Sequence, residues 1–361
     1  MRPVAWLVVV VLLTGASRTS ADDRSEQADS LHTAEITTMV TSAHDFLLKN
    51  QNKDGSFSVV RGRSSKNAPV AVTGLAALSL MAAGHLPAHE VMDRGRHGTA
   101  VKRAVDWLVD HCQDSGETSG YFYTGNDSVS RMHGQGYALL ALTQAAGMYG
   151  DDEVQRARLH AAIQRGVDLV ERTQGIHGGW WYNPERSANH EGSITVCMIQ
   201  ALRAAKDAGF TVDSGVIDKA LKYMEKSQDK STGKFRYALN DDRTTWALTA
   251  AALATLNALG DYGSDKLDLG FDALQRSDPY RGMGGGEAFQ WYGSFYAAQC
   301  YWAYRDRRLF QQWWPSFVEY CADDQWSDGS FHHGDYGQVY ATAMVSLTLQ
   351  VPFGYLPLFQ R

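Results

Sequence analysis

The sequence predicts an all-α fold in which six pairs of helices form two concentric layers around a ring. A degenerate block of glutamine, glycine and an aromatic residue returns about every 45 to 65 residues. The segments between copies alternate between amphipathic and almost fully apolar helical patterns. No linker rich in proline, glycine or serine interrupts them. Such a pattern indicates one supersecondary unit that is copied and stacked.

The recurring block has the strict form Gln-x-x-x-Gly-x-Trp/Phe at three places. These are Gln51/Gly55/Phe57, Gln174/Gly178/Trp180 and Gln325/Gly329/Phe331. Looser copies are Gln113/Gly120/Phe122, Gln228/Gly233/Phe235 and a glycine-rich variant from Gln275 to Gly286. Glycine permits the left-handed backbone of a helix end, and we expect each glutamine amide to bond the last free carbonyls of the preceding helix. We therefore interpret these residues as structural rather than catalytic.

The helix before each block is amphipathic. In residues 100–111, Val101, Val105 and Leu108 recur at helical spacing, while Lys102 and Asp106 occupy the other side. Such a helix exposes one face to water and buries the other, so we assign it to the outer layer.

The helix after each block carries almost no charge. The predicted ranges are 70–83, 137–146, 194–205, 246–259, 289–304 and 336–349. A helix that is apolar on most faces is buried on most faces, so these helices form the inner layer. The last of them is as apolar as the others, which favours a closed ring over an open stack with polar ends.

The N-terminal residues are typical of an export signal. Arg2 precedes an apolar run over residues 4–13, and Ser17 or Ala21 suits cleavage. The run is too short to span a bilayer, although an uncleaved anchor remains an alternative. We therefore predict a signal peptide over 1–21, a flexible leader over 22–33, one domain over 34–361, and an exported protein of the periplasm, the cell envelope or the exterior.

The net charge and the missing motifs limit the classes of partner and cofactor that the sequence predicts. The formal net charge is −6, and removing residues 1–21 makes it more negative by two. This balance excludes nucleic acid as the main partner, and no membrane segment remains after cleavage. The four cysteines lack metal-ligand spacing, and phosphate-loop, dinucleotide and metalloprotease motifs are missing. The sequence predicts neither a metal nor a cofactor, and it gives no protein partner.

The glutamine, glycine and aromatic turns between outer and inner helices resemble the QW repeats of squalene and oxidosqualene cyclases. The wider superfamily includes the β subunits of protein prenyltransferases. The resemblance covers residues 34–361 and implies an α/α toroid, a barrel of about six helix pairs whose central cavity holds an isoprenoid.

The sequence lacks the catalytic motifs of that superfamily. The cyclases use a D-x-D-D motif, whereas this chain has Asp241-Asp242 and Asp323-Asp324 without it. The Asp-x-Cys and histidine zinc ligands of the prenyltransferases are also missing, and Gln338 stands roughly where the histidine is expected. Fold resemblance alone therefore assigns no activity.

Polar residues gather just before the predicted inner helices. If these helices run in parallel, their N-termini meet at one mouth of the barrel. Candidate acids or bases there are Asp241, Asp242, Glu191 and Asp335, and candidate cavity residues are His133, His190 and Gln338. The alternative role of these carboxylates is to cap the N-termini of the inner helices.

Aromatic residues open several inner helices. They are Tyr137, Trp246, Trp291, Tyr292 and Tyr336. They either fill the barrel or line a cavity that accepts a hydrophobic, isoprenoid-like or saccharide ligand.

Three functions follow as hypotheses. The first is an exported binding or interaction module without standard cyclase or transferase chemistry. The second is a terpenoid cyclase-like enzyme that uses Asp241 or Asp242 as its acid. The third is a carbohydrate-active enzyme, with Glu191 and Asp241 as the carboxylate pair.

Overall fold

The computed structural model describes residues 33–58, 66–87, 96–127, 129–149, 152–259, 264–280, 289–332 and 335–359. The predicted signal peptide and the leader, apart from Thr33, lie outside these residues, as do Gly282 and Gly286 of the glycine-rich turn. Thr33 is the N-cap of the first described helix, and its side chain accepts a hydrogen bond from the backbone N–H of Ile36.

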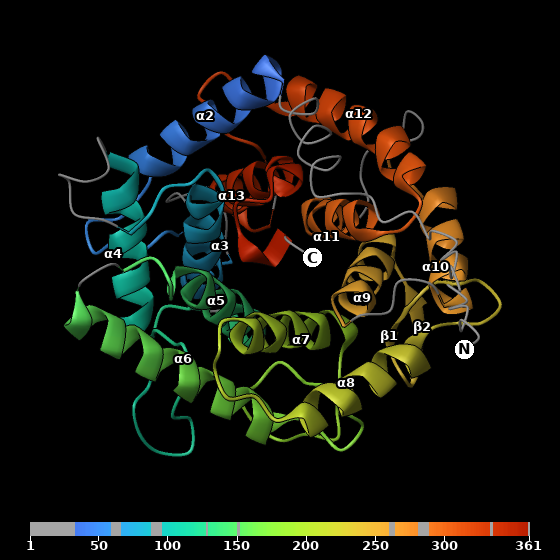
Figure 1. Cartoon of the computed structure of the whole chain (residues 1–361), viewed down its shortest axis with the longest axis horizontal. Helices are drawn as coiled ribbons and strands as arrows, with labels where there is room; N and C mark the ends of the chain where they lie inside the picture. Colours follow the sequence, from blue (N-terminus) through green and yellow to red (C-terminus); the bar gives the residue numbers. More distant parts are fainter. Residues whose placement is uncertain are drawn as a thin grey trace, which may run out of the picture.

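Within the described part of the chain, twelve α-helices form two concentric rings (Figure 1). The outer ring consists of α2 (Ala34–Lys49), α4 (Arg96–Asp110), α6 (Glu153–Thr173), α8 (Ser214–Ser227), α10 (Asp265–Arg276) and α12 (Arg307–Asp324). The inner ring consists of α3 (Pro69–Ala82), α5 (Arg131–Ala145), α7 (Gly192–Asp207), α9 (Trp246–Ala258), α11 (Gln290–Ala303) and α13 (Gly337–Leu349). Each inner helix packs on two inner neighbours, and α13 packs on α3, which closes the ring.

The α/α toroid predicted from the sequence is confirmed. The inner helices begin and end within two residues of their predicted limits, except that α5 begins six residues early, at Arg131 rather than Tyr137. Its first two turns carry His133 and Gln135, whose polarity hid the helical pattern. A short antiparallel hairpin of β1 (Arg236–Ala238) and β2 (Asp241–Thr244) and two 3-10 turns, η1 (Val351–Phe353) and η2 (Pro357–Phe359), were not predicted.

None of the helices in the described ranges is long and apolar enough to span a membrane.

The turn glutamines bond forward to the next unit. Gln174 Nε2 donates to Gly178 O in its own turn (3.0 Å) and to Val216 O on the following outer helix, α8 (2.8 Å). Gln51 and Gln228 bond their turn glycine and the next outer helix in the same way. The expectation that the glutamines bond the preceding helix is therefore wrong for these three, because their amides lie between the turn and the next unit. It holds for Gln275, whose Nε2 donates to Phe271 O on its own outer helix, α10 (3.4 Å).

The turn glycines allow the turn backbone to touch the next outer helix. Gly55 has φ +96°, and a Cβ atom there would lie 2.5 Å from Arg103 O on α4. Gly120, Gly178, Gly233 and Gly329 have φ between +81° and +90° and meet a backbone carbonyl of the next outer helix at even shorter range. Only glycine fits both the backbone angle and the missing space.

The aromatic residues of the three strict turns, Phe57, Trp180 and Phe331, are anchored to the inner helix that follows. Phe57 and Phe331 are 0% exposed, and Trp180 is 1% exposed. The backbone N–H of Phe57 donates to Thr73 Oγ1 on α3 (2.8 Å), and that of Phe331 donates to Thr342 Oγ1 on α13 (3.0 Å). Trp180 N–H donates to a threonine of α7 in the same way, at 3.1 Å. Each ring therefore fills the core while its backbone fixes the start of an inner helix.

In the second unit, a different glutamine bonds the turn to the next outer helix. Gln113 accepts a hydrogen bond from Thr118 Oγ1 within its own loop. Gln135 of α5 replaces it, since its Nε2 donates to Gly120 O (3.0 Å) and Gly166 O (3.5 Å). Gln135 Oε1 also accepts from Phe122 N (3.0 Å), and so takes the role that a threonine has in the strict turns.

The ring closes through the same contact. Gln325 Nε2 donates to Met39 O on α2, at 2.9 Å, which joins the last turn to the first outer helix. The first and last units also meet at the buried His44 of α2. Its Nε2 lies within hydrogen-bonding distance of Ser79 Oγ on α3 (3.1 Å) and Ser346 Oγ on α13 (3.0 Å). Gln350 Nε2 donates to Ser79 O (3.1 Å). A buried polar network therefore connects the first and last units.

We expect Gly329→Ala to destabilise the protein far more than Gly116→Ala. Both glycines have positive φ, +87° and +77°, but an added Cβ meets Ser42 O at Gly329 and nothing within 4 Å at Gly116. Backbone strain alone costs about 1 to 2 kcal/mol, so Gly116→Ala should stay in that range and Gly329→Ala should lose at least about 3 kcal/mol. Urea unfolding followed by circular dichroism measures both. Equal losses would show that the contact with α2 does not matter.

We also expect acid to weaken the protein through His44. Burial, and then the nearby His85 and His97, lower the pKa of His44 from 6.5 to about 3. Between these pH values the unfolded chain binds a proton that the folded protein does not, so stability falls as pH drops from about 6.5 towards 3. The loss is up to about 1.4 kcal/mol per pH unit for each such histidine. His44→Gln keeps a neutral polar group and should flatten the dependence. An unchanged slope of unfolding free energy against pH would contradict this assignment.

Candidate functional site

The described residues enclose a cavity of about 460 Å³ at the N-terminal ends of the inner helices. The N-cap residues of all six inner helices line it: Ala68, Ser130, Glu191, Thr245, Phe289 and Tyr336. The inner helices therefore run in parallel and meet at this mouth, so their positive dipole ends surround the space. The volume lies within the range of small-molecule sites.

Tyrosines dominate the wall of this cavity, which we call the tyrosine cavity. Six of them line it: Tyr137, Tyr182, Tyr237, Tyr292, Tyr336 and Tyr340. Tyr182 and Tyr237 share a hydrogen bond between their hydroxyl groups at 2.8 Å. Aromatic rings with polar tips bind ligands that combine an apolar face with hydrogen-bonding groups.

Two of these tyrosines turn their hydroxyl groups away from the open space of the cavity. Tyr137 is 4% exposed and Tyr292 is 8% exposed, and their buried hydroxyl oxygens lie beside Cys197 and Tyr296 respectively. Burial raises the pKa of both phenols well above the usual value, so both keep their proton. These two tyrosines therefore offer ring surface, and not hydroxyl groups, to a ligand in the cavity.

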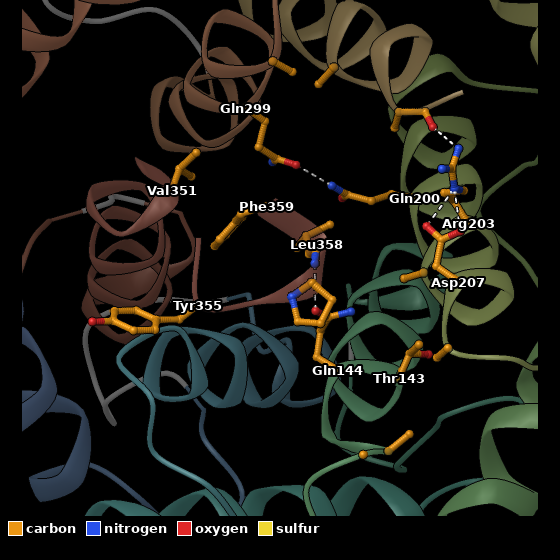
Figure 2. Close-up of a pocket in the computed structure, with 18 of the residues that line it drawn as sticks. Thr143, Gln144, Gln200, Arg203, Asp207, Gln299, Val351, Tyr355, Leu358 and Phe359 are labelled. Carbon is orange, nitrogen blue, oxygen red and sulfur yellow. Dashed lines mark hydrogen bonds and ion pairs between the residues drawn. The ribbon is translucent and has the colours of Figure 1, made fainter. Parts of the chain in front are cut away.

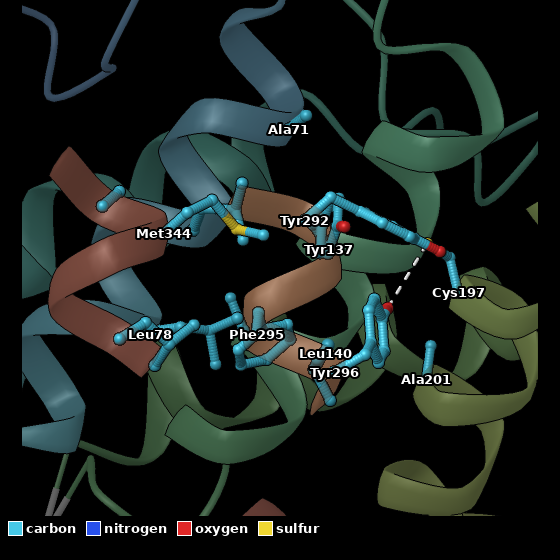
Figure 3. Packing of buried hydrophobic residues seen from close by; sticks show 14 of the residues in the cluster. Ala71, Leu78, Tyr137, Leu140, Cys197, Ala201, Tyr292, Phe295, Tyr296 and Met344 are labelled. Atoms are coloured by element: carbon cyan, nitrogen blue, oxygen red, sulfur yellow. Dashed lines mark hydrogen bonds between the residues drawn. The ribbon is translucent and has the colours of Figure 1, made fainter. Parts of the chain in front are cut away.

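A packed core closes the inner end of the cavity. Figure 3 shows Tyr137 and Tyr292 above Phe295, Tyr296 and Leu140, with Met344 to one side. Phe295, Tyr296 and Leu140 are all at most 1% exposed. The barrel therefore contains a blind cavity at this end and not an open channel.

Glu191 is the buried carboxylate of the tyrosine cavity. It caps α7, accepting from Ser193 N (3.0 Å), Ser193 Oγ (2.7 Å) and Ile194 N (2.9 Å). His133 Nε2 lies 2.9 Å from the same Ser193 Oγ. Burial raises the pKa of Glu191 against the opposing effect of its hydrogen bonds, and burial lowers the pKa of His133 to about 4. At neutral pH the imidazole is therefore uncharged.

Three cations stack on the tyrosines around the mouth. Arg243 lies 4.5 Å from the ring centroid of Tyr237, Lys66 lies 5.4 Å from that of Tyr336, and Arg131 lies 5.9 Å from that of Tyr182. Arg243 is also paired with Asp241 at 2.6 Å, and Lys66 with Asp335 at 2.8 Å. With Glu191 inside, positive and negative groups nearly balance, which favours an uncharged ligand.

Backbone strain is concentrated at the same mouth. Among the described non-glycine residues, only Arg131 and Phe289 have positive φ, at 45° and 66°. Phe289 lines the tyrosine cavity and is 49% exposed, and Arg131 stacks on Tyr182. Strained residues of this kind persist where the surrounding structure holds them, often at ligand sites.

The structure brings five of the residues singled out from the sequence to this cavity: Glu191, His133, Tyr137, Tyr292 and Tyr336. Polar and aromatic candidates from four inner helices thus converge, although the sequence places them far apart.

The other carboxylate candidates lie outside the cavity wall. Asp241 forms a bidentate pair with Arg243, whose side-chain and backbone hydrogen bonds lower the pKa of that carboxyl group. The Asp242 side chain is 87% exposed on the hairpin beside Arg236. Asp335 faces water at 62% exposure.

The remaining candidates are buried in the packing around the barrel. His190 lies 3.1 Å from Tyr223 OH, and Trp291 Nε1 donates to His332 O (2.9 Å). Trp246 is 1% exposed beside Tyr280. Gln338 Nε2 donates to Ser330 Oγ (3.0 Å) in the last turn.

The residues of the strict turns lie away from the tyrosine cavity. None of the nine belongs to its wall: Gln51, Gly55, Phe57, Gln174, Gly178, Trp180, Gln325, Gly329 and Phe331. The ring of Phe331 instead packs edge-on against Trp291 of α11, with ring centroids 6.0 Å apart. Phe57 is fully buried in the hydrophobic core. Their positions therefore agree with an architectural role and offer no contact to a ligand in this cavity.

Tyr182 and Tyr237 were missed from the sequence, although a signal was present. Each lies two residues after the aromatic residue of a turn block, Trp180 and Phe235. In an extended segment, residues two apart point to the same side, so a core-facing aromatic residue places the next one over the cavity.

Within the ranges that the structure describes, no three His, Cys, Asp or Glu side chains are grouped as a metal site would require.

Solved structures with the same architecture span almost the whole chain. A cellobiose 2-epimerase from Bacillus thermoamylovorans aligns with a TM-score of 0.63 and 12% identity, over 90% of this chain and 99% of that one. A family 76 α-mannanase from Bacteroides thetaiotaomicron gives 0.61 and 10%, over 89% and 96%. The type II terpene cyclase MstE from Scytonema gives 0.57 and 14%, over 89% and 99%.

The chain is an α/α toroid. Identities this low establish the fold of the toroid and nothing about its chemistry. Neither a protein-family model nor a curated protein matches the sequence significantly. The α/α-toroid fold implied by the QW-like turns is therefore confirmed, whereas membership of the squalene cyclases or prenyltransferases is not shown.

Proposed function

We propose that this toroid is an exported binding module that holds a saccharide in the tyrosine cavity. The observation that carries the proposal is a cavity of about 460 Å³ lined by six tyrosines, of which Tyr182 and Tyr237 join their hydroxyl groups by a hydrogen bond. Sugar rings present apolar faces to aromatic side chains and hydroxyl groups to polar tips, so both features of the wall suit them.

Polarity favours a saccharide over an isoprenoid. The cavity wall includes Ser130, Ser193 and Thr245 as well as the tyrosine hydroxyls. These three hydroxyls are hydrogen-bonded to Ala71 N, Glu191 and Leu248 N respectively, and each oxygen can take part in a further hydrogen bond with a ligand hydroxyl.

Binding without hydrolysis is supported by the number of carboxylates. Glycosidases generally place two carboxylates across the bond that they break. Glu191 is the one carboxylate among the described residues that line the tyrosine cavity, and its hydrogen bonds cap α7. Asp241 is committed to Arg243, and its lowered pKa makes it a poor proton donor for cyclase chemistry. Two of the solved structures with this fold, the epimerase and the mannanase, are named for saccharide chemistry.

We expect the mature chain to bind saccharides on a glycan array, and the affinity for those that bind can be measured by titration calorimetry. Tyr182→Leu and Tyr237→Leu should each weaken binding at least about tenfold, equivalent to about 1.4 kcal/mol, because each removes a ring and a hydroxyl from the wall. Tyr123→Leu, a change at an exposed tyrosine outside the cavity, should leave the affinity unchanged.

Two outcomes would contradict this proposal. If no saccharide binds on the array, saccharides are excluded as the ligand. Conversion of a bound saccharide to another product, lost in Glu191→Gln and in His133→Asn, would make the tyrosine cavity catalytic instead.

We also expect the protein to be exported with its first residues removed. Expressed with its own N-terminus, the protein should be found outside the cytoplasm, and N-terminal sequencing should begin at Arg18 or Asp22. A variant with Arg2→Glu, Leu7→Glu and Val9→Glu should not be exported, because it loses the positive start and the uninterrupted apolar run. A full-length chain retained in the cytoplasm would refute the export prediction, without affecting the test of saccharide binding.

A further inference from the structure

The barrel contains a second cavity at its opposite end. It measures about 890 Å³ and is formed by the C-terminal ends of α5, α7, α9 and α11 together with residues 351–359 (Figure 2). It shares no lining residue with the tyrosine cavity. Whether a ligand can pass from one cavity to the other decides how a long molecule can bind.

Side chains that cross the barrel separate the two cavities. Tyr296 OH on α11 donates to Gln200 Oε1 on α7 (3.2 Å), although α9 lies between these helices in the inner ring. Gln200 Nε2 donates in turn to Gln299 Oε1 (2.7 Å), a bond that Figure 2 shows. Phe295, next to Tyr296, is fully buried and packs edge-on against Phe359, with ring centroids 6.3 Å apart. Among the described residues, this packing leaves no path along the barrel axis.

The sides of the tyrosine cavity are closed as well. Each inner helix packs on two inner neighbours around the ring. Tyr137 and Tyr292, which form part of the wall, are both buried. Within the ranges that the structure describes, the tyrosine cavity is therefore open only at its mouth, where the N-caps of the inner helices meet.

A cavity with one opening restricts how a polymer can bind. A chain longer than the cavity must leave through the mouth by which it entered. An internal stretch would have to fold back and pass two lengths of chain through the same opening, with the entropy cost of ordering both. A chain end has to place only its last units inside. The shape therefore favours the end of a chain over its middle.

Phe289 lies where such a chain would leave. It is the N-cap of α11 and lines the tyrosine cavity, yet 49% of its surface is exposed. Its backbone has φ 66° and ψ 34°, a left-handed conformation that is rare for a bulky side chain. Strain of this kind persists where the surrounding structure holds a residue in place, often at ligand sites. The half-exposed ring offers its free face to a sugar unit just outside the cavity.

We propose that the tyrosine cavity binds the end of an uncharged glycan chain, and that Phe289 stacks on the unit that follows, outside the mouth. This mode of binding rests on the proposed saccharide site and specifies how that site is used. The terminal units contact the tyrosine rings and the paired hydroxyl groups of Tyr182 and Tyr237. An uncharged chain fits because the charges around the mouth nearly balance.

The dependence of affinity on chain length tests this mode in the unmodified mature protein. The probes are linear hexasaccharides of glucose, mannose, xylose and galactose, any other neutral saccharide that binds on the array, and a longer linear chain of each. Titration calorimetry gives the Kd per mole of chain. We expect the hexasaccharide and the longer chain to agree within about twofold, because each molecule carries the same ends. Recognition of internal units would instead lower the Kd of the longer chain in proportion to its number of units.

Phe289→Ala tests the stacking at the mouth. It removes the ring but keeps a Cβ atom, so the strain of the backbone is unchanged. Binding of a hexasaccharide should weaken at least about fivefold, whereas binding of the disaccharide of the same unit should change by less than about twofold. Tyr123→Ala is the matched control, because Tyr123 is 43% exposed and lies outside the cavity wall, and it should change neither affinity. Thermal unfolding verifies that both variants are folded.

The outcomes distinguish the mode of binding from the saccharide site itself. If no saccharide binds, both are overturned. If saccharides bind and the Kd per chain falls with chain length, the saccharide site stands and binding by the chain end is overturned. The stacking on Phe289 is overturned if Phe289→Ala binds hexasaccharides as tightly as the unmodified chain, or if it weakens the disaccharide equally.

Discussion

The ring depends on the contact that five turns, all within the described residues, make with the outer helix of the following unit. A turn glycine lies so close to the neighbouring helix that no Cβ would fit, and a glutamine amide bonds both sides of the contact. The contact fixes where the chain enters the inner layer, because the aromatic N–H that follows is bonded to the inner helix, as in Phe57 to Thr73. Without it, neighbouring outer helices would be joined only by side-chain packing and by exposed ion pairs such as Lys266–Glu225.

The tyrosine cavity is a consequence of this arrangement. Parallel inner helices bring six N-caps to one mouth, and the segments that leave the turns deliver Tyr182 and Tyr237 above them. The opposite mouth gathers helix C-termini, amides and small residues, and so has a different chemistry. One repeated unit thus produces two unlike cavities, because every helix has two different ends.

The fold could be predicted from the sequence because the signals are local and recur. Glycine, glutamine and helical periodicity mark the units, whereas the start of α5, the hairpin β1–β2, the two 3-10 turns and the partners of the turn glutamines were not predicted. The cavity could be predicted only in part. Tyr137, Tyr292 and Tyr336 open apolar helices, and that position placed them correctly. Which side chain faces inward depends on helix rotation and on bonds to distant residues. The sequence does not show that Asp241 and Glu191 have different roles. The pairing of Asp241 with Arg243 and the capping of α7 by Glu191 are seen only in the structure.

The bond from Gln325 to Met39 spans 286 residues of sequence, yet it repeats the bond that neighbouring units make elsewhere in the ring. In a closed ring, the first and last units differ from the others in their place in the sequence and not in their place in the fold. The bond that closes the ring therefore uses the same chemistry as the bonds between units that are adjacent in the sequence. Closure adds a further copy of an existing contact, so the same sequence pattern that stacks the units also determines that the last meets the first.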